Sequence, residues 1–184
     1  GAVAVKEYFP SFCAQRITQR GADIRCMAGM EQTYAVGMER FLREARTLRQ
    51  LNHVACVVRV TDFFEENHTA YLVMEYLDGK NLKQMAAGFG GRIPPEVLLP
   101  AMAPIIRALG QVHETGLIHR DVSPDNIMML SDGTMRLIDF GNARDASSGQ
   151  PMTLAMKEGF APVEQCRTRG QGTWTDVYSV CATI

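Results

Sequence analysis

Two motifs at a fixed distance constrain what this chain can fold into. The first is His119-Arg120-Asp121-Val122-Ser123-Pro124-Asp125-Asn126, and the second, Asp139-Phe140-Gly141, begins thirteen residues after the first one ends. His-Arg-Asp with Asn at a fixed offset arises by chance at roughly one position in 10⁵, so the combination is a specific signal. Between the two motifs, the apolar runs 127–130 and 135–138 flank Ser131-Asp132-Gly133-Thr134. This pattern predicts a β-hairpin that brings both motifs to the same end of one ribbon.

The two motifs resemble the catalytic loop and the metal-binding motif of eukaryotic-type protein kinases. The resemblance implies that Asp121 orients and deprotonates an acceptor hydroxyl, while Asn126 and Asp139 hold Mg²⁺ on the phosphates of ATP. It also implies that Arg120, beside the catalytic aspartate, binds a phosphate carried by an activation segment. Met128 joins the residues expected to contact the nucleotide.

Residues 2–9 are β-rich and partly alternating, which predicts a strand. A lone lysine in a strand is usually a solvated charge. Here Val-Ala-Val-Lys resembles the kinase strand whose lysine binds the α- and β-phosphates, which implies this role for Lys6. The resemblance also places Ala4 against the adenine ring. Residues 11–33 show no clear period and predict an irregular insert.

From about residue 34 to 52 the apolar positions follow helical spacing, with Glu44 at the edge of the apolar stripe. One interpretation is a surface glutamate that pairs with Arg40 or Arg43. In a kinase, however, the helix after the lysine strand supplies a glutamate that fixes this lysine, and the resemblance assigns that role to Glu44.

Residues 56–61 and 70–76 predict an antiparallel pair of strands around a Glu-Glu-Asn-His turn. The resemblance implies that Met74 guards the back of the adenine pocket, and that Glu75 to Leu77 form the hinge whose backbone pairs with the base. The general alternative is an edge strand followed by a turn at Asp78-Gly79. Both interpretations are compatible, because the hinge joins the two lobes.

Residues 95–114 predict a largely buried helix, in which Pro104 would cause a kink or a late start. The polar stretch 142–156, which contains Ser147, Ser148 and Thr153, is typical of an activation segment or of any flexible loop. Ala161-Pro162-Val163-Glu164 resembles the closing motif of that segment. Residues 174–179 resemble the start of the central helix of the large lobe, which implies that Asp176 braces the backbone of the catalytic loop.

One departure from the kinase pattern is chemical. Serine/threonine kinases normally carry a lysine two residues after the catalytic aspartate, and this chain has Ser123 there. Counting back from Glu164, the place where the family usually has a threonine is occupied by Lys157. We therefore expect Lys157 to reach into the site and to restore the missing charge, because an unshielded γ-phosphate would lose transition-state stabilisation.

The resemblance covers essentially the whole chain, but the Gly-rich loop would precede residue 1 and further helices would follow Ile184. We therefore expect a fragment of an α+β, bilobal, protein-kinase-like fold, with residues 1–76 in the sheet-rich N-lobe and 77–184 in the hinge and helical C-lobe. Such a fragment would expose apolar surface and be inactive in isolation.

Composition narrows the partners of the chain. A net charge of -1 over 184 residues gives no reason to expect nucleic acid. The five cysteines are scattered without a C-x-x-C pair, which favours a reducing cytoplasm. No apolar run approaches the roughly 20 residues that span a bilayer, and no signal peptide is evident. The resemblance leaves open a membrane anchor elsewhere in the parent protein.

Together these features indicate a bacterial-type serine/threonine protein kinase that uses ATP and Mg²⁺ on protein hydroxyls. Tyrosine kinases usually place Ala at position 123 and Arg near 125, and this chain has neither. One rival is a small-molecule kinase of the aminoglycoside type, against which Arg120 and the closing motif argue. A second rival is a pseudokinase that acts as a binding module, which Ser123 keeps open.

Overall fold

The computed structural model describes residues 1–17, 23–146, 157–167 and 170–184. These residues form two compact units. The first comprises Gly1–Asn52 and Arg59–Tyr76, and the second comprises His53–Val58 and Leu77–Ile184.

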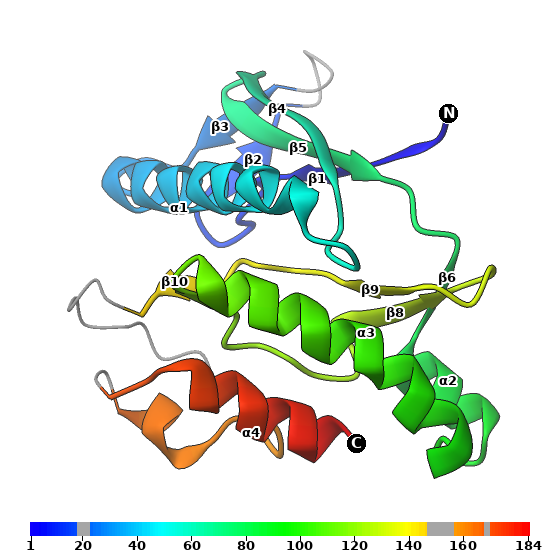
Figure 1. Cartoon of the computed structure of the whole chain (residues 1–184). Coiled ribbons are helices and arrows are strands. Elements are labelled where there is room, and N and C mark those ends of the chain that lie inside the picture. Colours follow the sequence, from blue (N-terminus) through cyan, green and yellow to red (C-terminus); the bar gives the residue numbers. More distant parts are fainter. Residues whose placement is uncertain (18–22, 147–156, 168–169) are drawn as a thin grey trace. The chain divides into compact units, whose positions relative to one another are not determined.

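The first unit is built on an antiparallel sheet with the strand order β1-β5-β4 (Figure 1). Its strands are β1 (Val3–Glu7), β4 (Val60–Glu66) and β5 (Thr69–Glu75). The β4–β5 turn has positive φ at both Asn67 and His68, the geometry of the two-residue turns that match the twist of a hairpin. Helix α1 (Glu31–Gln50) packs on β4 and β5 and buries Phe41, Leu42, Ala45 and Leu48.

Two predictions for the first unit need correction. The expected irregular insert contains a short antiparallel pair, β2 (Ala14–Arg16) and β3 (Ile24–Cys26). In addition, the strand expected over 56–61 begins only at Val60, because Val57 forms a bridge with Leu137 in the second unit instead. The 3-10 turn η2 (Leu51–His53) leads the chain into that segment.

The longest helix of the described part of the second unit is α3 (Pro95–Glu114), which has the predicted bounds. Pro104 does not delay the start of α3, since the helix runs from Pro95 through both internal prolines. Met102, Ile105 and Val112 are fully buried on α3. They belong to the apolar core of this unit.

The remaining elements of the second unit are short. The predicted hairpin is confirmed as β8 (Ile127–Leu130) and β9 (Met135–Leu137), with β6 (Gly79–Asn81) as the third strand. A second small sheet pairs β7 (Leu117–Ile118) with β10 (Arg144–Asp145). The other elements are α2 (Leu82–Gly88), η3 (Val163–Cys166) and α4 (Thr173–Thr183).

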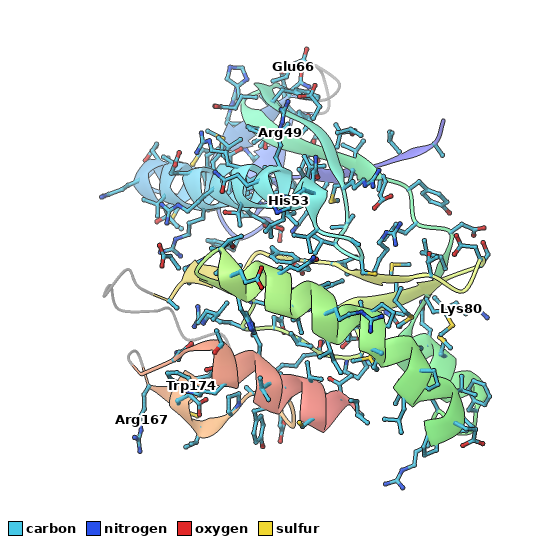
Figure 2. All side chains as sticks on the ribbon, viewed as in Figure 1. Arg49, His53, Glu66, Lys80, Arg167 and Trp174 are labelled. Carbon is cyan, nitrogen blue, oxygen red and sulfur yellow. The ribbon has the colours of Figure 1, made fainter. Side chains whose placement is uncertain are left out.

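Helix α4 buries mainly polar side chains and exposes large apolar ones, the reverse of an ordinary surface helix. Thr175, Asp176 and Ser179 are buried, whereas Trp174 and Tyr178 are more than half exposed. Figure 2 labels Trp174 on this helix. Within the described part of the chain, no helix combines the length and the hydropathy that a membrane span requires.

Candidate active site

In the first unit, Lys6 and Glu44 form an ion pair with 2.9 Å between Nζ and Oε1. Strand β1 presents Lys6 because its backbone pairs with β5, where Lys6 lies opposite Leu72. Glu44 comes from α1, and its side chain is only 8% exposed against 41% for Lys6. The ammonium also lies 5.9 Å from the centre of the Phe41 ring. The carboxylate is thus desolvated while the lysine keeps access to solvent.

The residues expected to contact adenine are divided between the two units. Ala4 pairs with Met74 across β1 and β5 in the first unit. There the Glu75 N–H donates to the Arg59 carbonyl at 3.0 Å, and the Glu75 carboxylate accepts from the Arg59 N–H at 2.9 Å. Leu77 belongs to the second unit, as does Met128, which pairs with Asn81 across β6 and β8.

In the second unit, the buried carboxylate of Asp176 holds the backbone of the catalytic loop, as expected from the sequence. Its oxygens accept from the N–H groups of His119 and Arg120, each at 2.7 Å, and from His113 Nε2 at 2.8 Å. Burial alone would raise the pKa of Asp176, but these hydrogen bonds outweigh it and lower the pKa. The carboxylate therefore stays charged inside the protein.

His119 is fully buried beside Phe140, with 4.5 Å between the ring centres. Its Nε2 faces the Ile138 carbonyl at 3.2 Å, and the Asp121 N–H donates to Nδ1 at 3.2 Å. This geometry requires a proton on Nε2 and none on Nδ1, so the ring is neutral. Burial lowers the pKa of His119, which agrees with a neutral ring.

Arg120 is buried, and amide groups surround it. Its Nε donates to Gln171 Oε1 at 2.7 Å, its Nη1 donates to the Asn142 carbonyl at 3.3 Å, and its own carbonyl accepts from Gln165 Nε2 at 2.7 Å. Burial lowers the pKa of Arg120. Ser147, Ser148 and Thr153 of the expected activation segment lie outside the described residues.

Asp121, Asn126 and Asp139 come together in the second unit. Asn126 Nδ2 donates to the Asp121 carbonyl at 2.8 Å, and the Ile138 N–H donates to the Asn126 carbonyl at 2.9 Å. The first bond turns the amide nitrogen toward the loop and leaves the amide oxygen as a ligand. Asp139 adopts φ 62° and accepts from the Gly141 N–H at 3.2 Å, while Asn142 Nδ2 donates to Asp121 Oδ2 at 3.3 Å.

This donor set fits magnesium. Mg²⁺ prefers oxygen ligands and is usually bound by one or two carboxylates together with substrate phosphates and water. The carboxamide oxygen of Asn126 and the carboxylate of exposed Asp139 are such ligands, and the backbone bond between Ile138 and Asn126 joins their two loops.

Lys157 lies against the catalytic loop. Its Nζ donates to Ser123 Oγ at 3.0 Å and forms an ion pair with Asp125. Asp125 also lies 3.3 Å from Lys83 Nζ. The hydrogen bond from Lys157 lowers the pKa of Asp125 against the opposing effect of burial, and Lys83 adds to the lowering. Among the described residues, Lys157 pairs with Asp125 rather than with Asp121.

The family model for the protein kinase domain matches residues 14–184. The chain belongs to the protein kinase family. This kinase chain is 34% identical over 173 residues to the serine/threonine-protein kinase PknL of Mycobacterium tuberculosis, a match that covers 88% of the chain and 43% of PknL. It is 36% identical over 167 residues to the serine/threonine-protein kinase pkn2 of Myxococcus xanthus, covering 85% of the chain and 19% of pkn2.

A solved structure named PpkA-294 apo form has the same fold, with a TM-score of 0.81 and 31% sequence identity. The match covers 98% of this kinase chain and 64% of that chain. The expected kinase-like α+β fold, with antiparallel sheet in one unit and mainly helix in the other, is therefore confirmed. The kinase chain spans less than half the length of PknL and of pkn2. Kinases of this family use ATP and Mg²⁺.

The kinase motifs did not reveal every residue of the site. Asn142, Gln165, Gln171, Asp125 and Lys83 contact the catalytic loop or its side chains, yet sequence analysis assigned none of them a role. Asp125 carried a weak signal, since it lies inside the motif beside Asn126. The amide side chains carried no signal, because a glutamine or asparagine in a polar stretch is normally expected to be exposed to solvent.

Proposed function

We propose that the protein containing this chain transfers the γ-phosphoryl group of ATP to serine or threonine hydroxyls of protein substrates. The observation that carries the proposal is the cluster of Asp121, Asn126 and Asp139. A 2.8 Å hydrogen bond joins Asn126 to Asp121 within the catalytic loop, and a 2.9 Å bond from the Ile138 N–H joins Asn126 to the loop of Asp139. The names of the relatives, serine/threonine-protein kinases in each case, support the choice of acceptor.

In this proposal the carboxylate of Asp121 orients the acceptor hydroxyl and takes its proton. The hydrogen bond from Asn142 to Oδ2 fixes the carboxylate and leaves Oδ1 for the hydroxyl. Asn126 and Asp139 hold Mg²⁺, which neutralises charge on the phosphates when bound. Lys6, oriented by Glu44, positions the α- and β-phosphates, and Ala4, Met74, Glu75, Leu77 and Met128 contact the nucleotide base. Arg120 stabilises the activation segment.

We also propose that the catalytic chain acts in the cytoplasm. ATP is available there, and the five cysteines of the chain are all free thiols, as a reducing compartment requires.

The test is phosphoryl transfer by the natural protein, with any flanking sequence it carries, from labelled ATP to a basic protein or to an aminoglycoside. We expect labelled serine and threonine in the protein acceptor. Asp121→Asn should lower kcat by about 10²–10⁴-fold, because a general base contributes that much. Asp62→Asn is the matched control, since Asp62 is exposed on β4 and its replacement can still accept from the Phe63 N–H.

Two results would overturn the proposal. Transfer to the aminoglycoside alone would indicate a small-molecule kinase. ATP binding without transfer to any acceptor, unchanged by Asp121→Asn, would indicate a pseudokinase.

A further inference from the structure

The catalytic loop has Ser123 where serine/threonine kinases normally have a lysine. The ammonium of Lys157, from another segment, lies beside this serine. Ser123 is fully buried, and its hydroxyl accepts from Lys157 Nζ at 3.0 Å. Ser123 is two residues from Asp121, which takes the hydroxyl proton in the proposed reaction. The ammonium of Lys157 therefore reaches the part of the loop that adjoins the proposed base.

Asp125 holds this ammonium in place. It forms ion pairs with Lys157 and with Lys83, so one carboxylate is shared by two cations and the group keeps a net positive charge. The backbone strengthens the arrangement, because the Lys83 N–H donates to the Pro124 carbonyl at 3.2 Å. Lys157 remains 32% exposed and keeps access to solvent. A cation that is held firmly, incompletely neutralised and accessible can bind a phosphate.

We propose that Lys157 is a catalytic residue that contacts the transferring phosphoryl group, and that Ser123 and Asp125 are the residues that position it. The inference rests on the proposed function and extends it. In the reaction the bond from phosphorus to the bridging oxygen of ADP breaks, the acceptor oxygen bonds to phosphorus, and the acceptor proton moves to Asp121. Lys157 stays protonated throughout and stabilises charge on the phosphoryl oxygens.

The position of Lys157 along the chain adds a condition. Lys157 follows Asp139-Phe140-Gly141 and belongs to no helix or strand. Its carbonyl accepts from the N–H groups of Phe160 and Ala161, and its side chain contacts the catalytic loop. A kinase with this lysine in its loop always has the charge beside the base. In this chain the charge beside the base depends on the contacts of Lys157 with Ser123 and Asp125.

The decisive experiment moves the charge back into the loop. In the natural protein, Lys157→Met should lower kcat by about 10²–10³-fold, the usual loss when a group that stabilises transition-state charge is removed. The double variant Ser123→Lys with Lys157→Met should recover most of that loss. Asp125→Asn should lower kcat by about tenfold or more with little change in KM for ATP, because Lys157 loses a bond to a charged partner. Lys80→Met is the matched control, since Lys80 is exposed on β6 (Figure 2).

Three outcomes separate the possibilities. Activity of Lys157→Met within twofold of the wild type overturns the inference. A double variant no more active than Lys157→Met also overturns it, because a lysine that only braces the segment would not be replaced by one at position 123. Lys157→Gln repeats the test if the methionine variant unfolds. A wild-type protein that transfers phosphate to no acceptor refutes the proposed function instead.

Discussion

The two units hold their functional groups in different ways. Lys6 in the first unit projects from a paired strand toward Glu44 on a helix of 20 residues, and one ion pair between regular elements aligns it. The catalytic loop of the second unit lies outside regular structure. The buried Asp176 carboxylate accepts a hydrogen bond from the loop backbone, and buried Gln171 accepts one from the Arg120 side chain.

Backbone conformation explains the difference. Arg120 and Asp139 have φ of 67° and 62°, where a residue other than glycine costs about 1–3 kcal/mol. Such a conformation persists only where surrounding contacts determine it. A paired strand such as β1 needs no such support. We therefore expect mutations that break the polar contacts to destabilise the second unit strongly, and mutation of the ion pair to affect activity much more than stability.

Asp176→Ala should have the largest effect on stability. The change leaves the N–H groups of His119 and Arg120 without their acceptor inside the protein, and it removes the partner of His113. An unpaired buried donor costs about 1–3 kcal/mol, and this change leaves two of them. Urea denaturation monitored by circular dichroism measures the change in unfolding free energy. A loss below about 1 kcal/mol would mean that the loop conformation does not depend on this carboxylate.

The sequence predicted the reacting groups of the second unit better than their support. Asp121, Asn126 and Asp139 follow a fixed spacing, which located them in the sequence. The long apolar periodicity of residues 95–114 located α3. The buried amides Gln165 and Gln171 have no such pattern. Their burial arises because α4 and η3 pack on the catalytic loop, and a polar residue in a polar stretch gives no indication of that contact.

In the first unit the errors have a different cause. Strands β2 and β3 are three residues long, too short for an alternating pattern to stand out from the insert. The run before β4 is apolar and resembles a continuation of that strand, but residues 53–58 belong to the second unit, where Val57 pairs with Leu137. Local pattern cannot distinguish two pairing partners for the same extended segment.

Gln171→Leu should have the second largest effect. Gln171 Oε1 accepts from the buried Arg120 Nε at 2.7 Å, and leucine would leave this donor unpaired. An unsatisfied buried donor costs about 1–3 kcal/mol. Gln15→Leu on the exposed face of β2 provides the same chemical change without that contact. Equal losses in the two variants, measured by urea denaturation, would contradict a specific role for the Gln171 amide.

Glu44→Gln should have the smallest effect on stability and still reduce activity. Lys6 is 41% exposed, so solvent screens the ion pair, and we expect a loss of less than about 1 kcal/mol. Phosphoryl transfer should fall by up to about 10²-fold, because a small displacement of a positioning group can cost that much. Glu39→Gln on the same helix removes an exposed pair with Arg46 and should leave both quantities nearly unchanged. If Glu44→Gln instead destabilised the protein as much as Asp176→Ala, the ion pair would be structural, and the contrast between the two units would be wrong.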